Sequence, residues 1–238
     1  MSNQLSCTCP SEQPCARKVP IFAALTDAEL AQVVSLITQK SYPKGSLVFR
    51  EGEPLENLYL INHGRIKVYR TAADGKEQIL YVLSEGDFLG ERNLLRSKPA
   101  EYTAETLEDT QVCVITRQDC QQLLLRYPSI SLKIIDELNK RLDKLELLFG
   151  NVSPRETDKR ICLMLLEFLE KYGTKQADQT VIIDLPLNRE EMANYIGLTR
   201  ETVSRRLNTY KEAGIIDFIG NKKLVILDVE TLKEACQY

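Results

Sequence analysis

The sequence lacks the features that mark enzymes and membrane proteins. It contains one histidine, His63, and shows neither a nucleophile motif nor a Gly-rich phosphate-binding loop, so we expect no enzyme activity. No apolar run approaches the ~18–20 residues of a membrane span, and the N-terminus has no signal-peptide core. We therefore expect a cytoplasmic protein with no membrane partner. A net charge of -3 argues against a surface made for non-specific nucleic-acid binding.

The first half of the chain shows a β pattern. With 238 residues the chain is long enough for two domains. Short β-rich runs between residues 40 and 116 alternate with glycine turns and predict a small antiparallel barrel or jelly roll. The predicted strands cover residues 47–49, 58–61, 66–70, 79–83 and 110–116. The turn glycines are Gly52, Gly64, Gly75 and Gly86, followed by the pair Gly90-Glu91.

A long helix is predicted after the strands, over residues 129–149. One set of its apolar residues has 3-4-3-4 spacing, which is the seam of a two-stranded coiled coil. This seam consists of Ile135, Leu138, Leu142, Leu145 and Phe149. Leu132, Ile134 and Leu148 lie off it and are expected to face the strands. The seam predicts a dimer helix, and the alternative is an ordinary core helix.

The last part of the chain predicts a winged helix-turn-helix. A Gly/Asn/Ser/Pro hinge at residues 150–154 precedes a helix over 155–172 and a strand over 180–185. Residues 187–213 then show apolar positions at helical spacing, interrupted by Gly197, with Thr199 as the cap of the second helix. A β-hairpin over 215–227 follows as the wing.

The run Leu198-Thr199-Arg200-Glu201-Thr202-Val203-Ser204-Arg205-Arg206-Leu207, followed by a wing, resembles the C-terminal domain of the CRP/FNR family of bacterial transcription regulators. The turn glycines resemble the cyclic-nucleotide-binding β-roll of that family. The resemblance implies an α+β chain with a Cys-bearing N-terminal arm (1–20), a β-roll (jelly roll) sensor (21–127), a dimerisation helix (128–150) and a winged helix-turn-helix (151–238). It implies a homodimer on double-stranded DNA at a palindromic operator, with RNA polymerase as a further partner.

The resemblance also implies which residues contact DNA. They are Thr199, Arg200, Glu201, Thr202, Ser204, Arg205 and Arg206. By position, Arg200, Glu201 and Arg205 match the base-reading residues of the cyclic-AMP receptor branch. Glu201, Ser204 and Arg205 match those of FNR. This hybrid set predicts half-sites resembling TTGAC or TGTGA, with the arginines on guanines and Glu201 on a cytosine.

The sensor site departs from the cyclic-AMP pattern. Gly90 and Glu91 match the effector pocket of relatives that bind cyclic AMP, in which an Arg-Ser pair about ten residues later meets the cyclic phosphate. Here Glu101-Tyr102 stand at that place, and a carboxylate would repel a phosphate. Lys98 could meet the cyclic phosphate only in a shifted alignment. We therefore do not expect the roll to bind a cyclic nucleotide.

The cysteines suggest another signal. Cys7, Cys9 and Cys15 form C-x-C-x5-C, and Cys113 lies in the last predicted strand. This resembles FNR, in which three N-terminal cysteines and one in the roll hold an oxygen-labile [4Fe–4S] cluster. The FNR pattern begins C-x2-C, so this chain departs from it.

Alternatives to the cluster remain open. The same cysteines can form a thiol–disulfide switch or a zinc site, or Cys113 can be a small buried hydrophobe. A further alternative is a roll that binds an organic acid or haem, although His63 is better explained as a turn residue than as a haem ligand. Cys120, Cys162 and Cys236 are expected in the core.

Overall fold

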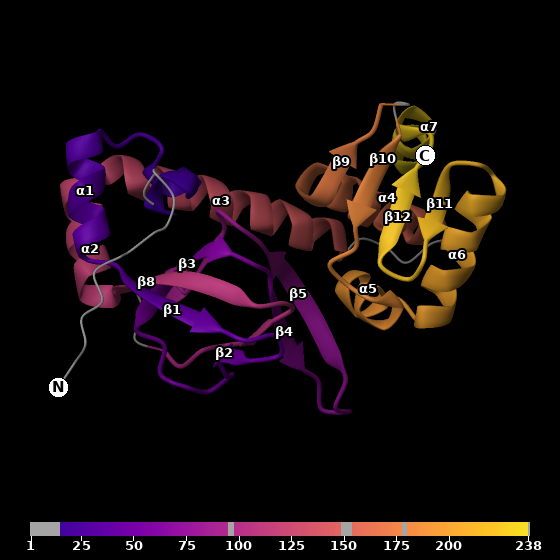
Figure 1. Cartoon of the computed structure of the whole chain (residues 1–238). Coiled ribbons are helices and arrows are strands. Elements are labelled where there is room, and N and C mark those ends of the chain that lie inside the picture. The colour runs from indigo at the N-terminus through magenta and orange to yellow at the C-terminus, as the bar shows by residue number, and fades with distance from the viewer. Residues whose placement is uncertain (1–14, 95–97, 149–153, 178–179, 238) are drawn as a thin grey trace. The chain divides into compact units, whose positions relative to one another are not determined.

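The computed structural model describes residues 15–94, 98–148, 154–177 and 180–237 (Figure 1). The chain forms two compact units. One contains residues 1–76 and 80–141, and the other contains residues 77–79 and 142–238. No helix in the described ranges combines the length and the apolar character needed to cross a membrane. The hinge predicted at residues 150–154 lies, apart from Pro154, outside the described residues.

The first unit is a β-roll with helices packed on it (Figure 1). Its strands are β1 (Thr38–Tyr42), β2 (Leu47–Phe49), β3 (Asn57–His63), β4 (Ile66–Thr71), β5 (Glu77–Leu83), β6 (Phe88–Leu89), β7 (Thr103–Thr106) and β8 (Thr110–Thr116). They form two four-stranded sheets, ordered β1-β8-β3-β6 and β2-β7-β4-β5. The jelly-roll expectation is confirmed.

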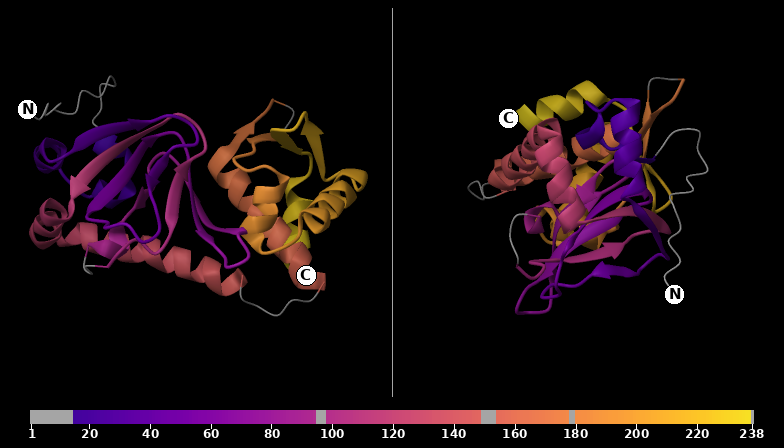
Figure 2. Two further views of the ribbon diagram at one scale, coloured as in Figure 1. Left: turned by 90° about the horizontal axis from the view of Figure 1, so that it is seen from below. Right: turned by 90° about the vertical axis from the view of Figure 1, so that its left-hand side faces the viewer.

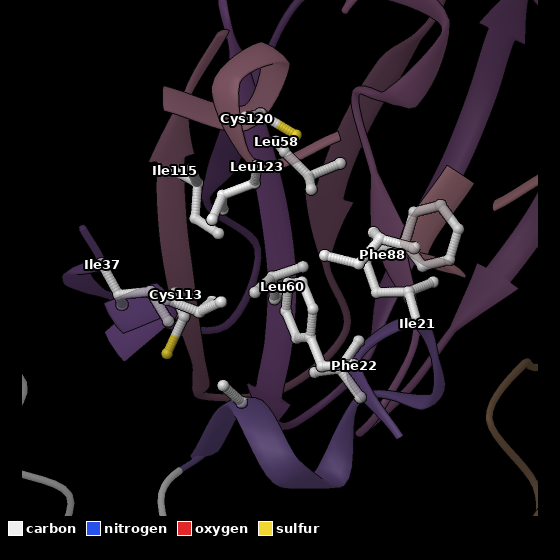
Figure 3. Packing of buried hydrophobic residues seen from close by; sticks show 14 of the residues in the cluster. Ile21, Phe22, Ile37, Leu58, Leu60, Phe88, Cys113, Ile115, Cys120 and Leu123 are labelled. Atoms are coloured by element: carbon white, nitrogen blue, oxygen red, sulfur yellow. The ribbon is translucent and has the colours of Figure 1, made fainter. Parts of the chain in front are cut away.

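Strands β3 and β8 of the first sheet are buried on both faces, which explains their continuous apolar runs. Successive side chains of a strand point to opposite faces. Leu58 and Leu60 therefore enter a cluster beneath the helices, while Tyr59 and Ile61 enter the cluster between the two sheets. Leu60 is paired in register with Cys113 of β8, and both side chains lie in the helix-covered cluster (Figure 3).

Helices cover one side of this sheet. They are α1 (Asp27–Ser35), α2 (Arg117–Arg126) and α3 (Pro128–Leu148), the last of which passes along the roll (Figures 1 and 2). Thr26 and Glu29 cap α1 reciprocally, as the capping box in the sequence indicates.

The end of the N-terminal arm has structure that the sequence does not indicate. Residues 15–18 and 20–22 form the 3-10 turns η1 (Cys15–Lys18) and η2 (Pro20–Phe22). Ala16, Val19, Ile21 and Phe22 are at most 2% exposed and belong to the helix-covered cluster. Short 3-10 turns carry no apolar period, so this segment becomes ordered through its burial against the roll.

The second unit is a winged helix-turn-helix. It contains α4 (Pro154–Tyr172), β9 (Gly173–Lys175), β10 (Val181–Asp184), α5 (Arg189–Ile196), α6 (Arg200–Glu212), β11 (Ile216–Ile219), β12 (Lys223–Ile226) and α7 (Val229–Gln237). Its sheet has the order β11-β12-β10-β9. The predicted helix pair and wing hairpin are confirmed.

Candidate nucleic-acid interface and sensor residues

The turn between α5 and α6 follows from its sequence. Asn188 and Glu191 form a capping box at the start of α5, with reciprocal bonds of 3.0 and 2.9 Å. Gly197 ends α5 in the left-handed region at φ 67°, where a side chain would be strained. Thr199 caps α6 by accepting a hydrogen bond from the Thr202 N–H at 3.3 Å. The chain is thereby reversed within a few residues.

One face of α6 holds the helix in place, and the opposite face is available for binding. Val203 and Leu207 are completely buried, and Tyr210 is 7% exposed. Arg200, Glu201 and Arg205 are exposed, whereas Thr202, Ser204 and Arg206 are half-buried.

The polar residues of α6 differ in whether they have partners. Arg206 Nε lies 2.9 Å from Oδ1 of Asp158 in α4, so this guanidinium joins two helices of its own unit. Arg200, Glu201 and Arg205 have no side-chain partner among the described residues. These three groups can therefore meet a ligand without first breaking an internal contact.

The wing packs beside the start of α5 through an aromatic ring. The guanidinium of Arg189 lies 4.4 Å from the centre of the Phe218 ring, and the Lys211 ammonium lies 5.8 Å from it. Lys211 also lies 2.6 Å from Asp217, and this contact together with the Phe218 N–H lowers the pKa of that carboxyl.

Arg189 was not predicted as a functional residue. Burial lowers its pKa, and its Nη1 atom is buried without a hydrogen-bond partner in the described structure. The signal in the sequence was a positively charged residue directly after Asn188, the N-cap of α5. The helix dipole disfavours positive charge at this end of a helix.

Comparisons with known proteins agree with this geometry. Residues 39–127 match the cyclic nucleotide-binding domain, and residues 159–235 match the Crp-like helix-turn-helix domain. The chain is 34% identical over 221 residues to the probable transcriptional regulator flp of Lacticaseibacillus casei, covering 92% of this chain and 97% of that protein.

The chain belongs to the CRP/FNR family of transcription regulators. It is a DNA-binding regulator of this type. It is 27% identical over 212 residues to the CRP-like cAMP-activated global transcriptional regulator of Mycobacterium tuberculosis, covering 89% of this chain and 94% of that one. The structure of FixK2 from Bradyrhizobium japonicum superimposes with a TM-score of 0.72 at 28% identity, covering 84% of this chain and 96% of that one.

Three cysteines of this family member have side chains that the structure describes. Cys113, Cys120 and Cys162 form no disulfide within the described residues, and each is at most 2% exposed. Burial raises the pKa of Cys120 to about 12, so this thiol stays protonated at neutral pH. Cys7 and Cys9 lie outside the described residues, as does the side chain of Cys236. Core positions are confirmed for Cys120 and Cys162.

Cys113 lies in the same cluster as the end of the arm. Cys15 opens η1, and the next residue, Ala16, is fully buried in the cluster that contains Cys113. Within the described residues, no group of three His, Cys, Asp or Glu side chains is placed to hold a metal ion.

The expected effector residues are engaged by the protein itself. The Glu91 side chain is 2% exposed and forms an ion pair with Arg141 of α3. Glu101, the carboxylate expected to repel a phosphate, lies 2.6 Å from Arg92 in an exposed ion pair.

The seam expected on α3 is partly exposed. Ile135 and Leu142 are 53% and 52% exposed, whereas Leu138 packs against the helix-covered cluster. The side chains of Leu145 and Phe149 lie outside the described part. Leu132 was expected to face the roll, and this is wrong because it is 69% exposed. On a helix, Leu132 lies close to the Ile135 face and away from buried Ile134.

Proposed function

We propose that the chain is a homodimeric regulator that binds a palindromic operator through one α6 helix per half-site. The observation that carries this proposal is that Arg200, Glu201 and Arg205, in the N-terminal half of α6, are exposed and have no side-chain partner in the part of the chain that the structure describes. A recognition helix presents this half to the major groove, and a dimer spaces two such helices about one DNA turn, roughly 34 Å, apart.

Each of these side chains has a defined role. Arg200 and Arg205 chelate guanine O6 and N7, and Glu201 accepts from cytosine N4 in half-sites resembling TTGAC or TGTGA. Ser204 meets a neighbouring base edge. Thr199 and Thr202 hold the start of the helix, and Arg206 braces α6 against α4. Arg189 holds the start of α5 against the Phe218 ring of the wing.

The homodimer forms along α3. Leu132, Ile135 and Leu142 leave an apolar stripe on the side of the helix opposite the roll, with the spacing of a coiled-coil seam. A second copy of α3 covers this stripe and removes its apolar surface from water. The dimer acts on DNA in the cytoplasm and contacts RNA polymerase.

The signal is redox, and it is received by Cys113 together with Cys7, Cys9 and Cys15. This assignment is supported by the burial of Ala16, the residue after Cys15, in the same apolar cluster as Cys113. Four thiolates are a suitable donor set for a [4Fe–4S] cluster. When bound, that group makes the attachment of the arm sensitive to oxygen. The residues of the chain then transmit the change through the helix-covered cluster to α3.

A thiol–disulfide switch is the second candidate. It is favoured by the close packing of Cys113, which is 1% exposed within an apolar cluster and leaves more room for one partner sulfur than for an iron–sulfur cubane. In this version Cys113 and one arm thiol lose two hydrogens to an oxidant such as peroxide, which is reduced to water, and a disulfide forms.

One experiment separates these versions. Protein purified without oxygen is assayed for iron, sulfide and visible absorption, and its cysteines are mapped by mass spectrometry before and after peroxide. A cluster gives a brown protein that bleaches in air, and Cys113→Ala loses the colour. A switch gives colourless protein in which Cys113 becomes disulfide-bonded, while Cys120→Ala, the matched buried control, behaves as wild type. If neither air nor peroxide changes the operator affinity of the wild-type protein, redox control is refuted.

A further inference from the structure

The wing is joined to both helices of the helix-turn-helix at one aromatic ring. Phe218 lies in β11, one residue before the end of that strand, and is half-buried. The guanidinium of Arg189, the first residue of α5, lies 4.4 Å from the centre of this ring. The ammonium of Lys211, in the last turn of α6, lies 5.8 Å from it. One side chain of the wing therefore contacts cations of both α5 and α6.

The links from the wing to the two helices differ in their exposure to solvent. Lys211 Nζ lies 2.6 Å from Oδ1 of Asp217, and this oxygen also accepts from the Phe218 N–H at 2.7 Å. The side chains of this ion pair are 51% and 49% exposed, so salt screens it. Arg189 is half-buried, and its Nη1 atom is removed from water. The contact between Arg189 and the ring is therefore the link that salt screens less.

Two local effects disfavour a cation at Arg189. The N-terminus of α5 is the positive end of the helix dipole, and burial lowers the pKa of the guanidinium. Among the described residues, no carboxylate lies within ion-pair distance of it. Residues that break such local rules occur mainly at functional sites. The Phe218 ring attracts the guanidinium, and because the ring is neutral it does so without cancelling the charge.

The position of this charge relates it to DNA. The first helix of a helix-turn-helix crosses the DNA backbone while the second enters the major groove. A positive charge at the start of α5 therefore adds to the attraction for phosphates. The same ring also holds the base of the wing tip, because β11 ends at Ile219 and the hairpin turn at residues 220–222 follows.

We propose that Phe218 is a positioning residue for DNA binding. Its ring fastens the wing to the start of α5 through the Arg189 guanidinium, and it leaves that charge uncompensated beside the phosphate backbone. An acidic residue at position 218 would also fasten the wing, but it would cancel the charge. The inference rests on the proposed operator binding through α6.

The test measures operator affinity over a range of salt concentrations and hydrogen exchange of the wing amides, both in the full chain. Phe218→Leu keeps an apolar side chain opposite Leu224, its cross-strand partner, and removes the ring. Phe218→Tyr keeps the ring, and Phe218→Glu replaces it with an acid. Phe218→Leu is also made in the Arg189→Met protein. Ile219→Ala is the matched control, because Ile219 is the next residue of the same strand and is 53% exposed.

We expect Phe218→Leu to weaken operator binding about fivefold and to accelerate exchange in β11 and β12 but not in α6, because the wing loses its link to α5. Phe218→Tyr and Ile219→Ala should stay within about twofold of wild type. In the Arg189→Met protein, Phe218→Leu should cause little further loss of affinity, since the ring then has no cation to hold. Phe218→Glu should keep wild-type exchange but lower the slope of log affinity against log salt concentration by about one.

Three outcomes would overturn the inference. The first is a Phe218→Leu protein with wild-type operator affinity. The second is an equal loss from Phe218→Leu with and without Arg189→Met, which would mean that the ring only fills space. The third is an unchanged salt slope in Phe218→Glu, which would mean that the charge of Arg189 does not act on DNA. A wild type that binds no operator DNA would instead refute the proposed function, while exchange in the wing of Phe218→Leu would still test the ring contact.

Discussion

The β-roll and the winged helix-turn-helix differ in which kind of side chain they expose. In the roll, Glu91 is buried and neutralised by Arg141, while the apolar side chains of Leu132 and Ile135 stand exposed on α3. In the winged unit the apolar face of α6 is buried, and Arg200 and Arg205 stand exposed. Exposed apolar surface serves association with another protein chain, whereas exposed unpaired cations serve association with phosphates and bases. This difference supports the proposed self-association through α3 and the proposed DNA reading by α6.

A charged substitution in the apolar stripe of α3 should have the largest effect, a loss of dimerisation. A charge at the centre of the dimer interface, as in Ile135→Glu, enters both copies and should cost about 4 kcal/mol of dimerisation free energy. Sedimentation should show a monomer, with operator binding lost. Lys133→Glu places the same group on the same helix at an exposed polar position and is the control. A dimeric Ile135→Glu protein would place the interface elsewhere.

Removing an exposed cation of α6 should affect DNA and leave the dimer intact. Arg205→Ala should lose roughly 1–3 kcal/mol of binding free energy on the specific site and should discriminate less at one base pair. Competition binding against operators substituted at each position measures both effects. Unchanged affinity and selectivity would contradict the base-reading role of this residue.

Alkaline pH should destabilise the roll in particular. Burial raises the pKa of Cys120 to about 12 and raises the pKa values of Tyr102, Tyr81 and Tyr42. The unfolded chain loses these protons from about pH 9 upward while the folded roll keeps them, so stability is fully present below that pH and falls as pH rises.

The alkaline loss can be measured by urea unfolding. Cys120 by itself should contribute roughly 1 kcal/mol of loss between pH 8 and pH 10. Cys120→Ala should show a shallower decline. A roll as stable at pH 10 as at pH 8 would mean that these groups ionise freely in the folded state.

The smallest effect is expected at a paired cation of α6. Arg206 is committed to Asp158, so Arg206→Ala should change the free energy of operator binding by about 0.5 kcal/mol or less. The same binding assay used for Arg205→Ala makes the two variants a matched pair. An equal loss of binding free energy in Arg206→Ala and Arg205→Ala would show that the Arg206–Asp158 ion pair breaks when DNA binds. The paired and the unpaired arginine would then contribute equally.

Much of the fold could be predicted because its elements carry local signals. β3 and β8 are apolar runs bounded by turn residues, and α5 and α6 are separated by Gly197. β1 was missed because Thr38–Tyr42 is a mostly polar edge strand, which has no alternation of apolar residues to detect. β7 at Thr103–Thr106 was missed because it has only four residues and a single apolar one, Ala104, which is too little for a period-2 pattern.

The candidate sites were predictable to a different extent. The charged and hydroxyl residues of α6 could be predicted as candidate DNA contacts because they are concentrated in the first turns of the helix. The sequence did not distinguish Arg205, which is exposed, from Arg206, which pairs with a residue 48 positions earlier. Leu132 was assigned to the wrong face because a spacing pattern identifies sets of positions on a helix, and not which set meets the neighbouring sheet.

The sequence by itself determined the family, most of the jelly-roll strands and the helix-turn-helix. These follow from periodicity, turn residues and residue types, which are properties of neighbours along the chain. Only the tertiary structure decided that Glu91 pairs with Arg141 and that the end of the arm joins the buried cluster that contains Cys113. The residues of each contact are far apart in sequence, and burial and countercharge act through space rather than along the backbone.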